Sequence, residues 1–322
     1  MKAFAYYRYG RPRDVLRLED RPIPKPGPGE VLIRNRAVGL NGADWEITVG
    51  YPFYSRIFGL FRPKQSVLGS DIAGVVEETG SDVTQFAQGD KVFGDIFERW
   101  GGFAEYVTAP ADKLLAIPEG MNFVTAASLP QPGTNALQPI CDDARVSAGQ
   151  KVLIIGACGS AGTFAVQLAK AAGAEVTAVD RGVKLDVARN LGADHVVDYE
   201  TENVTRRPER YDLILDYFAT RSVLAYRRIL APKGQYLFFG GKVLMLLGVF
   251  TLGRLLTRPG GQTYRLEAVT QTLERQQRFA EMVSQGKIKP VIERSCPLEE
   301  LPDALERMAS GGVRGKIVIV FP

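Results

Sequence analysis

Short runs of alternating apolar and polar residues fill the first third of the chain and predict an all-β region. Residues 29–38, 73–79 and 90–93 alternate in this way and are bounded by glycine, aspartate and proline. A strand turns every second side chain toward the core, so a period of two indicates half-buried strands. The N-terminal residues 1–10 alternate similarly, whereas the proline-rich stretch 21–29 favours an extended surface segment.

From about Asn122 the pattern becomes helical and then alternates between strand and helix. Helices are predicted over 123–129 and 133–142, followed by apolar strands at 151–155, 175–179, 195–199, 211–216 and 234–240. Strands that alternate with helices are typical of a doubly wound α/β sheet. After Thr263 we predict a helix through Met282, then strands at 288–292 and 315–321 with a helix at 298–309 between them.

The strand at 151–155 runs directly into a glycine-spaced turn and then into an amphipathic helix. Gly156, Gly159 and Gly162 allow a sharp turn and a close approach of the backbone to a pyrophosphate, whose charge the helix N-terminus stabilises. The candidate cofactor-binding residues of the turn are Gly156, Cys158, Gly159, Ser160, Ala161 and Gly162. For Cys158 we favour a packing role over thiol reactivity.

A second strand ends at Asp180, eighteen residues after Gly162, where a carboxylate can meet an adenosine ribose. Asp180 would accept hydrogen bonds from a free 2′-hydroxyl and repel a 2′-phosphate, which favours NADH. Arg181 favours NADPH instead, because a guanidinium can bind a phosphate. The sequence therefore predicts a nicotinamide dinucleotide, NADPH or NADH, and leaves the preference open.

The composition limits the number of domains and the possible partners, but it does not indicate a reaction. With 322 residues, two domains are expected, and a formal charge of +4 with interspersed signs does not favour nucleic-acid binding. Three separated cysteines argue against a disulfide framework, so we expect a cytoplasmic location. The apolar run 243–256 carries Arg254 and is shorter than a bilayer span, so we interpret it as a segment over the active-site cleft or an interface.

Several motifs in a fixed order resemble the medium-chain dehydrogenases/reductases, specifically the zinc-free quinone oxidoreductase-like branch. The matching segments are 39–45, 68–76, 83–94, 102–106, the Gly156 turn, 191–194 and 314–316. The resemblance implies a GroES-like partial β-barrel, residues 1–122 completed by 288–322, joined to a Rossmann domain, residues 123–287. It also implies a homodimer.

Zinc-dependent relatives of this family place Cys, His and a third ligand around a catalytic metal. Here Asn41 stands near the first ligand position, and Ser70 and Asp71 stand where a His-Glu pair would be. The chain contains no cysteine cluster, and we expect its lone histidine, His195, to be structural. We therefore expect no metal.

Without a Lewis acid to stabilise an alkoxide, reduction of a conjugated acceptor is easier than oxidation of a simple alcohol. The expected activity is therefore hydride transfer from NAD(P)H to a small-molecule quinone or α,β-unsaturated carbonyl. The resemblance places the segment from Asn41 to Tyr54 on the substrate side, with Asn41, Asp44, Tyr51 and Tyr54 as catalytic candidates. A structural hydrogen bond is an equal alternative for Asp44, and an apolar pocket wall is the favoured alternative for the tyrosines.

The resemblance also assigns residues to the cofactor. Thr134 matches a position near the nicotinamide, Phe239, Gly240 and Gly241 match a strand end that meets the carboxamide, and Lys316 lies in a matching motif. Lys184 and Tyr199 resemble the pattern of NADPH-using quinone reductases, from which Asp180 departs.

Two other functions stay open. One is a dehydrogenase or reductase of an alcohol, aldehyde or acyl thioester, for which residues 243–256 would line a long pocket. The other is a catalytically silent NAD(P)H-binding sensor or interaction protein, because a fold alone does not establish turnover.

Overall fold

The computed structural model describes residues 1–219, 221–241, 243–257 and 260–322. Contacts divide the chain into two compact units, residues 1–134 with 271–322 and residues 135–270. The predicted limits place 123–134 and 271–287 in the nucleotide-binding domain, whereas these segments belong to the first unit by contacts. The physical reason is packing, because the helix at 123–127 lies against strands of the first unit.

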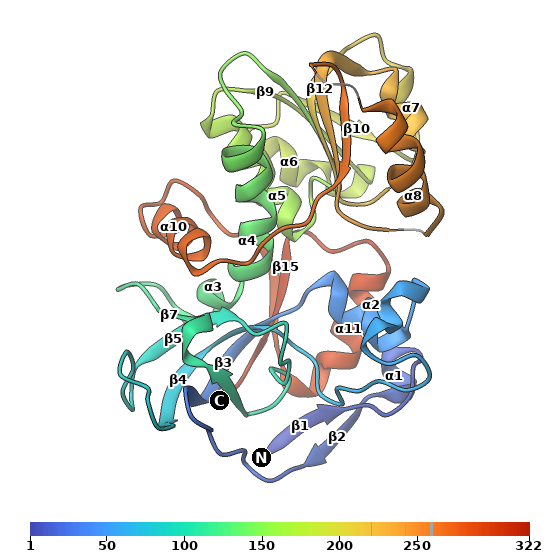
Figure 1. Cartoon of the computed structure of the whole chain (residues 1–322). Coiled ribbons are helices and arrows are strands. Elements are labelled where there is room, and N and C mark those ends of the chain that lie inside the picture. Colours follow the sequence, from blue (N-terminus) through green and yellow to red (C-terminus); the bar gives the residue numbers. More distant parts are fainter. Residues whose placement is uncertain (220, 242, 258–259) are drawn as a thin grey trace. The chain divides into compact units, whose positions relative to one another are not determined.

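The first unit is built mainly of strands (Figure 1). Its elements are β1 (Lys2–Ala5), α1 (Pro12–Val15), β2 (Arg17–Asp20), β3 (Glu30–Gly39), α2 (Gly42–Val49), η1 (Phe53–Phe58), β4 (Asp71–Thr79), β5 (Lys91–Asp95), β6 (Tyr106–Pro110), η2 (Ala111–Lys113), β7 (Leu114–Ala116), α3 (Phe123–Ala127), α10 (Leu273–Ser284), β14 (Ile292–Pro297), η7 (Leu298–Glu300), α11 (Leu301–Ala309) and β15 (Lys316–Val320). Helix α4 (Pro130–Leu137) spans the unit boundary.

A seven-stranded sheet organises this unit. Its strand order is β14-β15-β3-β4-β5-β7, with β6 also paired to β3. The C-terminal strand β15 lies antiparallel to β3, so the last residues of the chain complete the sheet begun near its start. The partial barrel and the strands predicted at 29–38, 73–79 and 90–93 are confirmed. The predicted strand at 288–292 is displaced, since β14 begins only at Ile292.

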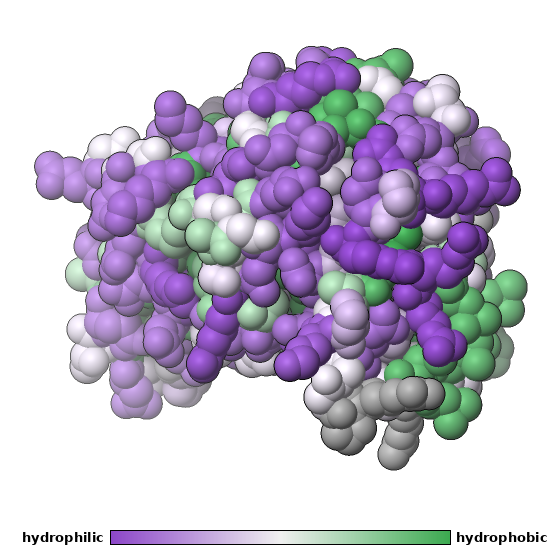
Figure 2. Space-filling model, turned by 90° about the horizontal axis from the view of Figure 1, so that it is seen from above, coloured by the Kyte–Doolittle hydropathy of each residue, from purple (hydrophilic) through white to green (hydrophobic). Residues whose placement is uncertain are grey.

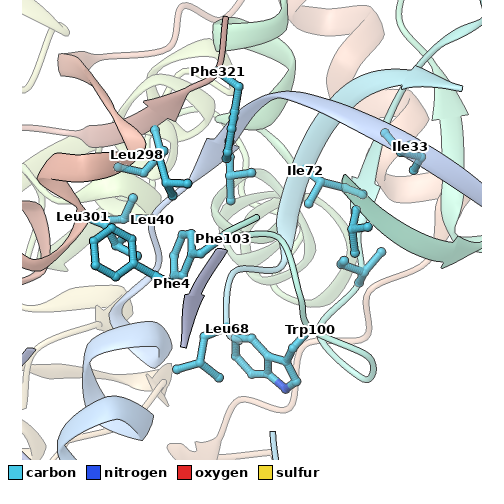
Figure 3. Packing of buried hydrophobic residues seen from close by; sticks show 14 of the residues in the cluster. Phe4, Ile33, Leu40, Leu68, Ile72, Trp100, Phe103, Leu298, Leu301 and Phe321 are labelled. Atoms are coloured by element: carbon cyan, nitrogen blue, oxygen red, sulfur yellow. The ribbon is translucent and has the colours of Figure 1, made fainter. Parts of the chain in front are cut away.

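The core of the first unit combines residues from both ends of the sequence. Figure 3 shows Phe4 and Phe103 packed near Leu298 and Leu301. Each of these four side chains is at most 6% exposed. Because the core joins N-terminal and C-terminal segments, it fixes β15 beside β3.

The second unit alternates strands and helices (Figure 1). Its elements are η3 (Gln138–Asp143), β8 (Lys151–Ile155), α5 (Ser160–Ala171), β9 (Glu175–Asp180), η4 (Gly182–Lys184), α6 (Leu185–Asn190), β10 (His195–Asp198), η5 (Val204–Arg206), β11 (Tyr211–Asp216), α7 (Val223–Arg227), β12 (Leu230–Phe238), α8 (Val243–Gly248), η6 (Val249–Gly253), α9 (Arg254–Leu256) and β13 (Thr263–Leu266).

Its sheet has the order β10-β9-β8-β11-β12-β13, and all its pairings are parallel. This is the order of a Rossmann fold, with the topological switch between β8 and β11, and it confirms the predicted doubly wound domain. The helix predicted from Thr263 is wrong at its start. Residues 263–266 instead extend the sheet as β13 beside β12, and the helix, α10, begins at Leu273.

The described part of the chain contains no helix with the length and apolar character needed to cross a bilayer.

Candidate functional site

The glycine turn of the second unit joins the C-terminal end of β8 to the first turn of α5. Gly156 has a φ of +81°, which a side chain would strain, and Gly159 is the N-cap of α5. At Gly162 a Cβ atom would lie 2.1 Å from the carbonyl oxygen of Gly156. The third glycine is therefore required for packing, whereas a Cβ on Gly159 would approach no atom closer than 3.4 Å.

The carboxylate of Asp180 ties the end of β9 to this turn. Its Oδ2 accepts a hydrogen bond from the backbone N–H of Cys158 at 2.9 Å, and its Oδ1 accepts one from the N–H of Arg181 at 2.8 Å. The ammonium of Lys184 lies 2.6 Å from Oδ1, and both side chains of this ion pair are less than 10% exposed. Both oxygens of Asp180 thus have partners within the chain.

Cys158 is fully buried within the turn. Its thiol donates a hydrogen bond to the carbonyl oxygen of Lys184. Burial, with the nearby charge of Asp180, raises the pKa of Cys158 to about 12, so the thiol stays protonated at neutral pH.

Two other predicted cofactor residues lie near the ends of β9 and β10. The guanidinium of Arg181 pairs with Glu200 at 3.0 Å, and this ion pair is open to solvent. The ring of Tyr199 stacks on Phe218 with 5.8 Å between centroids. The structure therefore separates Arg181, on the surface, from Lys184, which is buried against Asp180.

The predicted carboxamide-binding segment follows β12. Phe239 donates its backbone N–H to the carbonyl oxygen of Asp216, and its ring lies 4.2 Å from that of Tyr217. Gly240 and Gly241 have φ values of +152° and +136°, a region open to glycine. This backbone is shaped by contacts with the end of the neighbouring strand β11.

A buried polar cluster lies in the first unit, where three distant segments meet. The ammonium of Lys316, from β15, donates to Oδ1 of Asn41 at 2.6 Å and to Oδ2 of Asp71 at 3.0 Å. Lys316 is 2% exposed and Asp71 is fully buried. Lys316 thus contacts two residues noted in the sequence as standing near zinc-ligand positions.

The amide of Asn41 is oriented by Lys316. An ammonium only donates hydrogen bonds, so it fixes Oδ1 toward itself and turns Nδ2 away. That nitrogen is buried and has no hydrogen-bond partner within the described residues. A buried unpaired donor is costly, so this atom is suited to a ligand oxygen.

Asp44 lies in the first turn of α2 and is completely buried. Its carboxylate accepts hydrogen bonds from the backbone N–H groups of Asn41, at 2.7 Å, and Gly69, at 3.2 Å. Burial raises the pKa of Asp44 to about 7, although both N–H groups favour its charged form. The side chain holds the loop that presents Asn41.

Gln131 and Asp95 extend the cluster and were not predicted. The Gln131 amide nitrogen donates to Ser70 at 2.9 Å and to Asp95 at 3.3 Å. Burial and the nearby Asp71 raise the pKa of Asp95 to about 7. No local motif marks these residues, because the sheet brings them together from separate strands and α4.

The remaining candidates lie apart from these hydrogen bonds. Tyr51 and Tyr54 follow α2 and are 57% and 36% exposed. Thr134 is buried in α4, where its hydroxyl donates to the carbonyl oxygen of Pro130. Within the described residues, no three His, Cys, Asp or Glu side chains are grouped to hold a metal ion.

Two family models match the chain. Residues 27–119 match the alcohol dehydrogenase GroES-like domain, and residues 191–319 match the zinc-binding dehydrogenase family. A 2-methylene-furan-3-one reductase from Solanum lycopersicum is 32% identical over 99% of this chain and 79% of its own length. An NADPH-dependent alkenal/one oxidoreductase from Arabidopsis thaliana is 31% identical, with the same coverage.

Solved structures agree with these matches. A quinone oxidoreductase from Coxiella burnetii superposes with a TM-score of 0.89 and 28% identity, covering 100% of this chain and 99% of its own. The similarity thus extends through both units rather than to the glycine turn alone. The chain belongs to the medium-chain dehydrogenase/reductase superfamily, in its quinone oxidoreductase-like branch.

Proposed function

We propose that this protein is a zinc-independent, NAD(P)H-dependent oxidoreductase that reduces a quinone or an α,β-unsaturated carbonyl compound. The observation that carries the proposal is the side-chain nitrogen of Asn41, a buried donor without a partner in the described chain. The names of the relatives support it, since they refer to a methylene-furanone, to alkenals or alkenones, and to quinones.

The glycine turn fits a dinucleotide. Gly162 permits close packing of α5 on the turn, and the first N–H groups of this twelve-residue helix are suited to a pyrophosphate. Residues 156–162 would hold the phosphates, and the backbone after β12 would hold the carboxamide. A bound nicotinamide would supply the hydride.

Asn41 would stabilise the substrate charge. Addition of hydride to the β-carbon of an enone, or to a quinone, places negative charge on the carbonyl oxygen. The Asn41 N–H would donate to that oxygen, and Lys316, behind the same amide, would add a positive potential in a buried environment. Asp71 limits the cost of burying that ammonium.

A proton must follow the hydride to complete the reduction. Tyr51 and Tyr54 are sufficiently exposed to exchange protons with water, and they are the proposed donors. Their alternative role is to form the apolar wall of the pocket. Replacing each tyrosine by phenylalanine distinguishes the two roles. Activity should be lost if the hydroxyl donates the proton, and it should be kept if the ring only forms the apolar wall.

For the cofactor we propose NADPH. The Lys184 ammonium, 2.6 Å from Oδ1 of Asp180, offsets the negative charge of this carboxylate. The other oxygen, Oδ2, accepts a hydrogen bond from the backbone of the turn. Arg181 remains at the surface of the same strand end, where exchange of its partner Glu200 for a 2′-phosphate costs little. One relative is also named for NADPH dependence.

The test is loss of reduced-nicotinamide absorbance with NADPH and NADH in parallel, against quinones, enones, aldehydes and an acyl thioester, with and without a chelator. We expect chelator-insensitive oxidation of NADPH with a quinone or enone. Turnover confined to aldehydes or thioesters would instead support the alcohol, aldehyde or acyl-thioester alternative. Tight cofactor binding without turnover of any acceptor would support a sensor.

A further inference from the structure

The connection between β1 and β2 concentrates arginine at the surface of the first unit. The two strands pair antiparallel and are joined by residues 6–16. Three side chains of this connection, Tyr6, Val15 and Leu16, are at most 6% exposed and belong to the core of the unit. Because the apolar residues turn inward, the arginines of the same connection are left on its outer side.

A pocket of about 420 Å³ lies at this connection. All the residues that line it come from the segment 8–17. The charged residues of the lining are Arg8, Arg11, Arg13, Asp14 and Arg17. Four arginines and one aspartate give the lining a formal charge of +3. The volume is that of a ligand pocket, and the charge favours an anionic ligand.

Two of the four arginines are unpaired. Arg8 and Arg11 are exposed, and within the described residues their side chains form no ion pair and no hydrogen bond. The charge of Arg13, by contrast, is compensated, because its Nε lies 2.6 Å from Oδ1 of Asp303. An unpaired guanidinium keeps all its N–H donors for a ligand, so Arg8 and Arg11 can each bind an oxyanion through two hydrogen bonds.

The backbone holds Arg17 in place. Its guanidinium donates to the carbonyl oxygens of Leu16, at 2.8 Å, and Asp14, at 2.9 Å. Carbonyl oxygens fix the position of this group but do not neutralise its charge. Arg17 thus adds a fixed positive charge to the pocket, and an anion that binds there does not have to order this side chain.

The pocket is fixed to α2 and to the segment that follows it. Tyr9 lines the pocket, its hydroxyl donates to the carbonyl oxygen of Gly59, and its ring centroid lies 4.7 Å from the guanidinium carbon of Arg56. The backbone N–H of Gly10 donates to the carbonyl oxygen of Thr48 at 3.2 Å. Helix α1 also contacts α2 and α11, and Figure 1 shows the three together. The pocket is therefore formed before any ligand binds.

Exposed arginine alone would not mark a site. Figure 2 shows hydrophilic surface spread over most of the face that it displays, as expected for a chain with 24% charged residues. The segment 8–17 differs in two respects. Its arginines line one pocket, and three of them, Arg8, Arg11 and Arg17, have no acidic partner in the part of the chain that the structure describes.

We propose that this pocket binds a small molecule that carries two or more linked phosphate groups. A phosphate group has about 1.5 to 2 negative charges and three acceptor oxygens, so two of them balance the formal charge of +3. Guanidinium groups match this geometry, because they bind phosphate through two parallel hydrogen bonds. Two phosphate groups fill only part of the 420 Å³, which leaves room for the organic group that carries them.

The experiment is calorimetric titration of the full chain with inorganic pyrophosphate, and with inorganic phosphate and sulfate for comparison. Saturating NADPH is present, because the glycine turn is the other place where a diphosphate would bind. We expect pyrophosphate to bind more tightly than phosphate or sulfate, and to bind weakly at high salt. If the protein binds no NADPH, the variants below still locate the site, so failure of the proposed function does not affect this test.

Substitutions in the pocket should act with opposite signs. Arg8→Gln and Arg11→Gln should each weaken pyrophosphate binding about fivefold, because each removes one exposed charge partner of the ligand. Asp14→Asn should tighten binding, since it removes the negative charge from the lining. Thermal unfolding should be unchanged in these variants, whose substituted side chains are exposed.

Two arginines of the second unit supply the matched control. Arg189 and Arg206 are exposed and have no acidic partner within the described residues. The double variant Arg189→Gln with Arg206→Gln removes the same net charge as Arg8→Gln with Arg11→Gln. It should bind pyrophosphate like the original protein.

Any of four results would overturn the proposal. They are no binding of pyrophosphate, equal affinity for sulfate and pyrophosphate, equal losses in the pocket variant and in the control variant, or weaker binding after Asp14→Asn. The second and third results would show that the anion responds only to the overall charge of the protein.

Discussion

The glycine turn of the second unit and the polar cluster of the first unit are built in opposite ways. The turn is local, since Gly156 and Gly162 lie within one strand–turn–helix unit and constrain each other through backbone contact. The cluster is assembled over long distances along the chain, because Lys316 and Asn41 are separated by 275 residues. The glycine turn depends on the shape of the backbone, and the polar cluster depends on the burial of charged side chains. They should therefore respond differently to substitution.

Removing the buried charge should have the largest effect. Lys316→Met leaves the Asp71 carboxylate buried without a counter-charge, which should lower the free energy of unfolding by about 3–5 kcal/mol. Urea unfolding measures this loss. Adding Asp71→Asn should restore stability but not activity.

The control is Lys151→Met, which breaks an ion pair that is open to solvent, with side chains 42% and 39% exposed. This change should cost at most about 1 kcal/mol. If Lys316→Met and Lys151→Met lowered the free energy of unfolding equally, the buried ion pair would contribute no more to stability than an exposed one.

Removing the oriented donor should affect rate more than stability. Asn41→Ala should lower the rate of hydride transfer about 100- to 1,000-fold, as expected for a lost oxyanion donor. Single-turnover kinetics measures the rate of hydride transfer, and urea unfolding measures the stability. In a cofactor titration, the cofactor affinity should stay near its original value.

Asn122→Ala serves as the comparison, because Asn41 is the N-cap residue of α2 and Asn122 is the N-cap residue of α3. The Asn122 side chain accepts a hydrogen bond from the Thr125 N–H at 2.8 Å. That change should cost about 1 kcal/mol of stability and leave the rate intact. A normal rate for Asn41→Ala would remove Asn41 from the proposed reaction.

Substitutions at two glycines of the turn distinguish packing within the protein from the close approach of the cofactor. Gly162→Ala places a Cβ 2.1 Å from a carbonyl oxygen and should destabilise the protein by about 1–3 kcal/mol, with loss of cofactor binding. Gly159→Ala has room in the protein alone and should weaken only cofactor binding. Thermal unfolding without cofactor and calorimetric titration distinguish them. Equal melting temperatures for the two variants would disprove the packing argument.

The smallest effect concerns pH. Burial raises the pKa of Glu46, in α2, to about 7. The folded protein then binds this proton more tightly than the unfolded chain, so stability should fall as the pH rises from about 4 to 7 and level off above that range. Glu46→Gln should reduce this slope. Denaturant unfolding across the pH range measures it, and an unchanged slope would assign the dependence to Asp44 or Asp95.

The contrast between the two regions also explains what the sequence can predict. The period of apolar residues and the glycine spacing are local signals, and they led to the all-β region, the doubly wound domain and the turn. The partial barrel followed only from the resemblance to a family. The strand β13 was missed because residues 263–266 adopt it only through pairing with β12. Lys316 was expected to bind cofactor, but its hydrogen bonds to Asn41 and Asp71 depend on how β15 enters the sheet.

The ion pair between Lys184 and Asp180 limits how cofactor specificity can be redesigned. Replacing the acidic residue at the end of β9 by a small one would normally be the first step in strengthening the binding of a 2′-phosphate. In this chain that step alone would leave the Lys184 ammonium buried without a partner and release the N–H of Cys158. A design that changes cofactor use must therefore replace both residues together, and it must provide a new acceptor for the turn.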